Sequence, residues 1–316
     1  MRLSAMFPDR QNATALSSAA EIAARRRKSR IRWSVRAAIY AILLGLPLGC
    51  GLDRLFYHPD STLYYTPAQL NLRHEDVRFT TRDGVRLHGW WLPALTNRPL
   101  GTIVHFHGNA ANISNHILAA YWLPAAGYHV LMFDYRGYGQ SEGSPTRKGT
   151  IADGHAALDY VLTRPEVDRE RLYFYGQSLG GAVAVVVAAE RPEVRKIIVE
   201  QTFGDYREIG AEHLARRVLW KGLAQAIAWA TVSDGYDPID VVAKISPRPV
   251  FVIASEEDAI CFPALGRRLF DAAAEPKQFW LAQGAEHLSI HDRLQAEHER
   301  RVLEFLSDES TSTIGD

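Results

Sequence analysis

One serine in this chain lies in a sequence context that could make it a nucleophile. Residues 176–180, Gly-Gln-Ser-Leu-Gly, form a Gly-x-Ser-x-Gly pattern, which in hydrolases occupies a sharp turn between a buried strand and a helix. Residues 172–175 favour a β-strand, and residues 182–190 are rich in alanine and valine. The N-terminal end of such a helix stabilises negative charge that develops at the serine. We therefore predict that Ser178 is a catalytic nucleophile.

A serine hydroxyl becomes a good nucleophile only when a base removes its proton and a third group orients that base. The predicted strand 249–254 is followed by Asp258, and the predicted strand 277–282 is followed by His287. The order serine, acid, histidine, with each residue after a strand, is typical of one class of serine hydrolases. We predict that His287 takes the proton of Ser178 and that Asp258 orients His287.

Other residues compete for these roles or carry the same functional groups elsewhere. Three further carboxylates are alternatives to Asp258: Glu256, Glu257 and Asp205. His291 and His298 fall on the predicted C-terminal helix, and we expect both at the surface.

Acyl transfer also needs two backbone N–H groups that stabilise the developing oxyanion. The residue after the nucleophile, Leu179, is expected to supply one. The second is expected from the loop 108–112 after the predicted strand 103–107, and we assign it to the amide of Asn109. Gly108 would let the backbone approach a substrate closely.

A second glycine-rich run, residues 134–143, follows the next predicted strand. We interpret it as scaffold at the same sheet edge, and we expect Asp134 and Arg136 to brace it by ion pairing.

The elements around these motifs alternate between strand and helix, after a predicted hairpin over residues 74–95. Such alternation predicts a mostly parallel sheet with helices on both faces. Strands are expected near 101–107, 128–134, 172–177, 195–200, 249–254 and 277–282. Helices are expected near 110–126, 148–163, 180–190, 263–274 and 290–306.

One interval, residues 204–246, is too long for a simple strand connection. Its apolar residues recur at helical spacing, which predicts a helix over 206–231. We expect a short helical lid over the catalytic edge; the alternative is an insertion without substrate contact.

Composition limits the other functional classes. The 316 residues contain 36 basic and 36 acidic side chains, but residues 1–36 hold nine basic residues against two acidic ones. The remainder is mildly acidic, so we expect no nucleic-acid partner. The two cysteines, Cys50 and Cys261, exclude a disulfide framework, and no Cys/His spacing predicts a metal site.

The N-terminal region has a pattern typical of membrane targeting. A basic run over 25–36 precedes residues 37–52, which carry no charge, and this order predicts a signal anchor with the body of the chain on the extracytoplasmic side. Alternatives are a cleaved signal, a lipoprotein acylated at Cys50, or a buried core helix. The predicted segments are a basic, disordered tail at 1–36, an anchor or signal segment at 37–52, a linker at 53–71, a hydrolase domain at 72–306 and a disordered C-terminal tail at 307–316.

Three motifs together resemble the α/β-hydrolase superfamily, and in particular its membrane-anchored serine-aminopeptidase-like and depalmitoylase-like groups. They are residues 105–109, 134–139 and 176–181, and the similarity covers about residues 70–306. The resemblance implies the α/β-hydrolase fold and a serine hydrolase without a metal or organic cofactor. The family's nucleophile, acid and base positions match Ser178, Asp258 and His287.

The expected activity is hydrolysis of a small carboxylic ester or thioester through an acyl-enzyme. A peptidase or amidase of the serine aminopeptidase type is an alternative, because the same three side chains serve both reactions. A further alternative is a binding protein that retains a hydrolase scaffold without catalysis.

Overall fold

The structure is a computed structural model that describes residues 56–217 and 220–308. These residues belong to one compact unit, residues 52–316. The predicted tail at 1–36, the apolar segment at 37–52 and Cys50 lie outside the described residues. Within the described ranges, no helix combines the length and the apolar composition needed to cross a bilayer.

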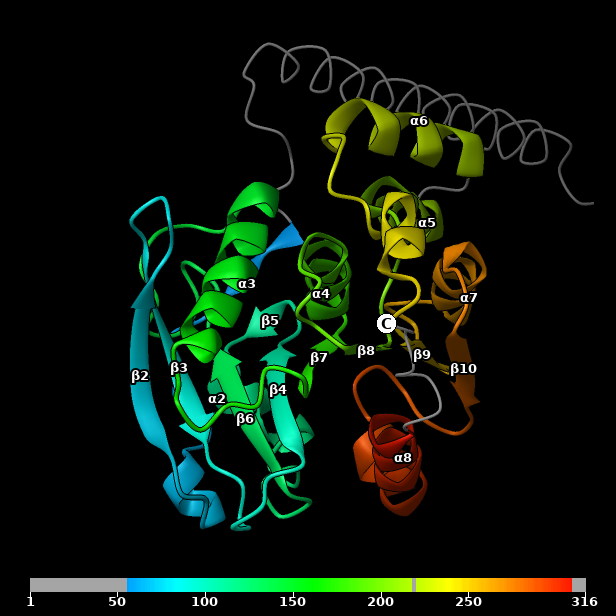
Figure 1. Ribbon diagram of the computed structural model, residues 1–316. Helices are drawn as coiled ribbons and strands as arrows, with labels where there is room; N and C mark the ends of the chain where they lie inside the picture. Colours follow the sequence, from blue (N-terminus) through cyan, green and yellow to red (C-terminus); the bar gives the residue numbers. More distant parts are fainter. Residues whose placement is uncertain (1–55, 218–219, 309–316) are drawn as a thin grey trace, which may run out of the picture. The chain divides into compact units, whose positions relative to one another are not determined.

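An eight-stranded sheet with the order β10-β9-β8-β7-β4-β6-β3-β2 forms the centre of this unit (Figure 1). Its strands are β2 Glu75–Thr80, β3 Arg86–Leu92, β4 Gly101–Phe106, β6 Tyr128–Phe133, β7 Leu172–Gln177, β8 Lys196–Glu200, β9 Val250–Ser255 and β10 Lys277–Ala282. β3 pairs antiparallel with β2 and β6, and every other pairing in this sheet is parallel. The predicted hairpin is confirmed as β2–β3.

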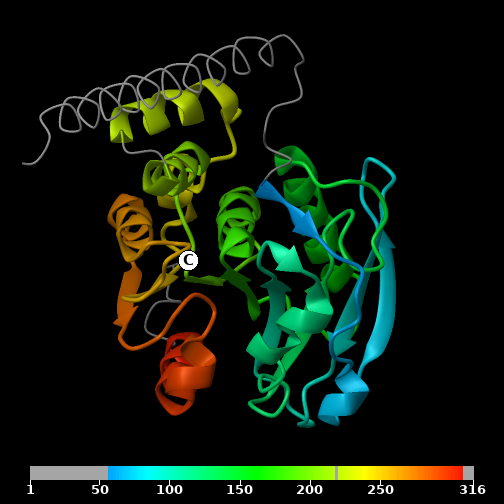
Figure 2. The same ribbon diagram turned by 180° about the vertical axis from the view of Figure 1, so that it is seen from behind.

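The central strands are buried along their whole length, whereas the edge strand β10 alternates in exposure. This difference arises because helices cover both faces of the parallel part of the sheet. One face packs against α3 Arg147–Leu162, α4 Leu179–Glu190 and α7 Pro263–Ala272, and the other against α2 Ile113–His116 and α8 Ile290–Ser307 (Figures 1 and 2). The predicted fold class, a mostly parallel sheet between helices, is confirmed.

The predicted helix over 110–126 is much shorter in the structure. Ala110–Ala111 form the short strand β5, which pairs in parallel with β1 His58–Pro59. That pairing removes both alanines from the helix, and the side chain of Asn112 caps α2 by accepting from the Ser114 N–H. A 3-10 turn over Ile117–Ala119 follows α2.

The segment 53–71, predicted as a linker, is packed against the domain from Phe56 onwards. Besides β1, it contains the 3-10 helix η3 Pro67–Leu70, and the Phe56 ring lies 5.9 Å from the ring of Tyr206. A linker composition does not reveal this packing, because the partners lie far along the chain.

The described part of the insertion 204–246 contains two α-helices within residues 206–231, where the sequence predicts one. They are α5 Tyr206–Arg217 and α6 Lys221–Thr231, and they pack against each other (Figure 1). Trp220, at the start of α6, has an extended backbone. The break lets α6 fold back and bury Ala224 and Ala228, which a single continuous helix could not do.

Candidate active site

Ser178 lies on the turn between β7 and α4 and has a positive φ of 52°, with ψ −122°. The glycines around it are needed sterically. A Cβ atom at Gly180 would lie 2.1 Å from the carbonyl oxygen of Phe106, and one at Gly176 would lie 2.5 Å from the carbonyl oxygen of Gly180. The Gly-x-Ser-x-Gly pattern therefore reflects close backbone contacts around a strained serine.

The structure brings the side chains of Ser178, Asp258 and His287 into one hydrogen-bonded chain. The Nε2 atom of His287 lies 3.1 Å from Oγ of Ser178, and its Nδ1 lies 2.8 Å from Oδ2 of Asp258. Because a carboxylate only accepts hydrogen bonds, Nδ1 is the donor there, which leaves Nε2 to accept from the serine hydroxyl.

Burial and a second set of hydrogen bonds hold Asp258 in place. Its side chain is fully buried, whereas that of His287 is 18% exposed. Oδ1 of Asp258 accepts from the backbone N–H groups of Ile260 and Cys261, both at 2.8 Å. The carboxylate therefore presents its other oxygen to the imidazole in a fixed direction.

The alternative acids lie elsewhere. Glu256 and Glu257 are exposed. The Asp205 side chain accepts from the N–H of Glu208 in the first turn of α5, at 2.9 Å. Only Asp258, among these four carboxylates, is hydrogen-bonded to His287.

The two residues predicted to supply oxyanion donors both lie at the sheet edge that carries Ser178. Leu179 is the first residue of α4. Asn109 follows β4, and its side-chain oxygen accepts from the N–H of His58 at 3.1 Å and from the hydroxyl of Tyr138 at 3.0 Å. A Cβ at Gly108 would lie 2.9 Å from the His116 ring, so this loop is closely packed.

Three histidines on either side of the loop 108–112, namely His105, His107 and His116, are kept neutral by burial. Desolvation lowers the pKa of His105 to about 3 and holds the pKa values of His107 and His116 below their usual range. They therefore add no positive charge beside the serine near neutral pH.

A thiol is also close to the serine. Sγ of Cys261 lies 3.7 Å from Oγ of Ser178. Burial is the largest cause that raises the pKa of this thiol far above its usual value. Because the thiolate is the reactive form, Cys261 is present as an unreactive thiol.

The insertion contacts the loop that carries Asp258. Nε2 of His213, on α5, lies 3.0 Å from the carbonyl oxygen of Ile260, and the Arg216 guanidinium lies 4.0 Å from the ring centre of Phe262. The insertion therefore packs at the edge where the three side chains meet.

The ion pairing expected to brace this run is confirmed at Arg136, which pairs with Asp153 on α3 and with Asp83 in the β2–β3 turn, at 2.9 and 2.7 Å. Asp134 accepts from the N–H of Ile113 at 2.9 Å. Each charge meets a partner on a different element, which agrees with a scaffold role for this run.

The expectation that His291 and His298 are surface residues is wrong. His298 is fully buried, and its Nε2 lies 2.7 Å from Oε2 of Glu200. Tyr175 and Gln177 donate to the same carboxylate, each at 2.8 Å. His291 is buried and lies 3.1 Å from Glu299.

This buried network was missed because its partners come from different elements. Burial opposes ionisation of Glu200, but His298, Tyr175 and Gln177 together keep the pKa of its carboxyl below the usual value. The available sequence signal is Glu200 itself, a carboxylate that directly follows the apolar residues 197–199 of β8.

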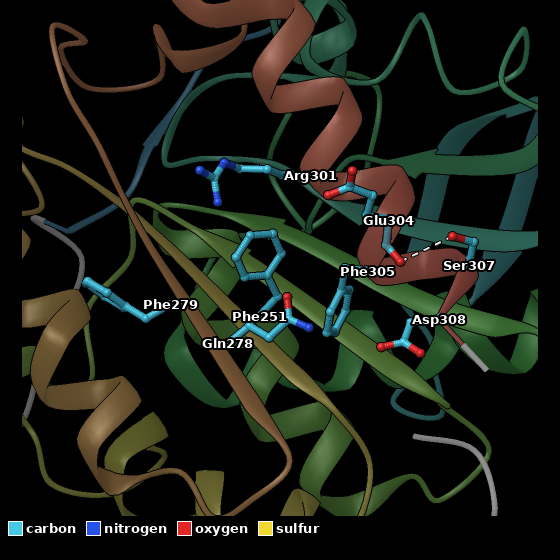
Figure 3. Close-up of a pocket in the computed structure, with 8 residues that line it drawn as sticks. All are labelled: Phe251, Gln278, Phe279, Arg301, Glu304, Phe305, Ser307 and Asp308. Carbon is cyan, nitrogen blue, oxygen red and sulfur yellow. Dashed lines mark hydrogen bonds between the residues drawn. The ribbon is translucent and has the colours of Figure 1, made fainter. Parts of the chain in front are cut away.

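A cavity of about 350 Å³ lies elsewhere, between β9, β10 and α8 (Figure 3). It is lined by Phe251 and Gln278, which pair near the amino ends of their strands, whereas Asp258 and His287 follow the carboxyl ends. This cavity is therefore separate from the three side chains. Among the residues that the structure describes, no cluster of three or more His, Cys, Asp or Glu could hold a metal ion.

Comparison with known proteins identifies relatives of this chain. A family model described as serine aminopeptidase, S33, matches residues 97–248. The uncharacterised protein YfhR of Escherichia coli K12 is 32% identical over 257 residues, which cover 79% of this chain and 86% of YfhR. The α/β hydrolase domain-containing protein WAV2 of Arabidopsis thaliana is 33% identical over 215 residues, 66% of this chain and 70% of WAV2.

A similar fold occurs among solved structures. An esterase of Pyrococcus furiosus matches with a TM-score of 0.67 at 23% identity, over 79% of this chain and 97% of the esterase. Together with the sheet order and the turn at Ser178, these relatives establish that the chain belongs to the α/β-hydrolase superfamily.

Proposed function

We propose that this protein is a serine hydrolase that cleaves carboxylic esters or thioesters through an acyl-enzyme on Ser178. The observation that carries this proposal is the continuous hydrogen-bonded chain from Asp258 through His287 to Ser178. A base within hydrogen-bond reach of a serine, itself oriented by a buried acid, is the arrangement that activates a serine hydroxyl.

In the first step, His287 Nε2 takes the hydroxyl proton while Oγ of Ser178 attacks the acyl carbon. Asp258 keeps the proton on Nδ1 and stabilises the imidazolium. His287 then gives the proton to the leaving alcohol or thiol, which leaves the acyl group on Ser178. Water, activated by the same imidazole, attacks the acyl-enzyme and releases the carboxylic acid and the free serine.

The oxyanion of each tetrahedral intermediate is proposed to accept from the N–H groups of Leu179 and Asn109. Leu179 begins a helix, so its N–H has no partner within that helix. Anchoring of the Asn109 side chain by His58 and Tyr138 supports a fixed orientation for this loop. No metal or organic cofactor takes part in the proposed reaction.

An acyl substrate is supported by the character of the insertion, which we propose to act as a lid. Trp220, immediately before α6, and Trp229, on α6, are each 71% exposed, and exposed aromatic surface of this kind suits contact with apolar chains. The family description of serine aminopeptidase favours a second candidate, a peptidase or amidase. A non-catalytic binding protein remains the third.

We further propose that the catalytic domain is held on the extracytoplasmic side of a membrane. The basic run at 25–36 followed by the uncharged residues 37–52 supports a signal anchor, and acylation at Cys50 is the alternative. Fractionation of cells would place wild type in the membrane, and a radiolabelled fatty acid incorporated by wild type but not by Cys50→Ser would favour the lipoprotein.

The activity is tested with chromogenic esters, a thioester and a chromogenic amide. We expect wild type to hydrolyse p-nitrophenyl esters from acetate to palmitate and a palmitoyl thioester, with no turnover by Ser178→Ala. Faster cleavage of an amino-acid p-nitroanilide would favour the aminopeptidase. Binding of esters without turnover would favour the binding protein.

A further inference from the structure

Glu200, at the end of β8, and the two residues that follow it contact the proposed nucleophile and the loop that carries the proposed base. The carbonyl oxygen of Glu200 accepts from the N–H of Ser178 at 2.9 Å. The hydroxyl of Thr202 donates to the carbonyl oxygen of Ser178 at 2.6 Å. The backbone of Ser178 is therefore held on both sides by this strand end.

Between these two residues, Gln201 reaches the loop of His287. Its Nε2 donates to the carbonyl oxygen of Glu286 at 2.8 Å, and its Oε1 accepts from the N–H of Leu288 at 2.6 Å. Gln201 is buried, with only 1% of the residue exposed. One amide thus binds the peptide groups immediately before and after His287, and both bonds require the same orientation of that amide.

The backbone conformations at this contact are unusual. Gln201 has φ 48° and Leu288 has φ 57°, and φ is also positive at Ser178. Non-glycine residues keep such strained conformations only where their surroundings determine them strongly. The N–H of Gln201 donates to the carbonyl oxygen of Ile253 at 2.7 Å, which fixes Gln201 to β9.

The sheet explains why such a contact is needed. β10 is the third neighbour of β7, so the loop after β10 must reach back about 14 Å at the usual spacing of strands. It crosses the end of β8 on the way (Figure 1). Asp258 holds His287 only through its ring, so this contact does not itself fix the peptide groups on either side of His287.

We propose that Gln201 is a positioning residue that sets the separation of His287 from Ser178. The proposal rests on the proposed function of these two residues. Without the amide, the imidazole spends less time within reach of the serine hydroxyl, so proton transfer slows while the acyl-binding surface is unchanged. A displacement of about 1 Å at a reacting group can cost about 100-fold in rate.

The test measures labelling of the full chain by a fluorophosphonate probe, which phosphonylates an activated serine. The plateau of labelling gives the active fraction, and the limiting rate at saturating probe gives the reactivity of each active molecule. Gln201→Met keeps a similar side-chain volume and removes both hydrogen bonds. Gln201→Asn tolerates the left-handed backbone, and its shorter side chain cannot reach both peptide groups.

We expect both variants to lower the limiting rate by about 10- to 100-fold, with the probe concentration for half-saturation within twofold of wild type. Thr150→Val is the matched control, because it removes a buried side-chain hydrogen bond to the Arg147 carbonyl on α3, away from this site. It should lower thermal stability and leave the limiting rate unchanged.

A limiting rate within twofold of wild type in both Gln201 variants would overturn the proposal. A loss confined to the plateau would overturn it too, because it would mean that Gln201 supports only folding. Failure of the proposed function itself looks different: wild type would then label no faster than Ser178→Ala.

Discussion

The imidazole of His287 lies 3.1 Å from the hydroxyl of Ser178, although the two residues are 109 positions apart in the chain. The contact exists because the loops after β7, β9 and β10 leave the same edge of a parallel sheet. Active sites of open α/β sheets are found at this carboxyl edge. The fold therefore supplies the geometry, and the residues at the strand ends supply the chemistry.

The orienting acid can be tested by a change of one functional group. Asp258→Asn keeps the size of the side chain but offers an amide to Nδ1 of His287, which favours the wrong tautomer. We expect ester hydrolysis to fall by about 10⁴-fold with the fold retained. Glu257→Gln, at an exposed neighbouring position, is the control. A larger effect of the Glu257 change would show that the acid is assigned to the wrong residue.

The turn itself makes a steric prediction. Gly180→Ala places a Cβ atom 2.1 Å from the carbonyl oxygen of Phe106, so the backbone must move. We expect the free energy of unfolding in urea to fall by roughly 1–3 kcal/mol, together with loss of activity. Gly222→Ala, whose added Cβ meets nothing nearer than 4.0 Å, should be neutral or stabilising. Equal stability of the two variants would contradict the packing described.

The buried histidines predict sensitivity to acid. The pKa of His105 falls from 6.5 to about 3 because burial disfavours its charged form. Below pH 6.5 the unfolded chain therefore binds a proton that the folded chain does not, so stability decreases as pH falls towards 3. The contribution is up to about 1.4 kcal/mol per pH unit.

Unfolding free energies measured between pH 6.5 and 4.5 test this linkage. His105→Gln removes the titrating group, so its pH slope should be shallower than that of wild type by up to the same amount, whatever its absolute stability. His107 and His116 shift in the same direction and retain their share of the slope. Identical slopes in wild type and variant would refute the assignment to His105.

Cys261 should be inert in the folded protein. Burial raises the pKa of its thiol, so little thiolate forms at pH 8. We expect iodoacetamide to leave the Cys261 peptide unmodified until urea unfolds the chain, as followed by mass spectrometry. Alkylation of Cys261 at the same rate in the native and unfolded protein would contradict its burial beside Ser178.

Local sequence was sufficient where the relevant interactions are local. The strand, turn and helix around Ser178 follow from adjacent residues, and the alternation of strands and helices determined the fold class. His298 could not be placed in this way, because its partner Glu200 lies on a distant strand. The same limit applies to Gln201, whose role depends on peptide groups 85 and 87 positions away.

Tertiary contacts explain the two places where a predicted helix differs from the structure. Ala110 and Ala111 have high helix propensity, but pairing with β1 draws them into a strand. The single helix expected over 206–231 divides into α5 and α6 because folding back buries apolar residues of α6. Tertiary contacts of this kind override local propensity.

The central claim is that Ser178 is an activated nucleophile. The most direct measurement is labelling of purified full-length protein by a fluorophosphonate probe, with wild type beside Ser178→Ala and both checked for folding. We predict labelling of wild type at Ser178, located by mass spectrometry, and none of the variant. Equal labelling of both proteins, or no labelling of folded wild type, would contradict the proposed mechanism.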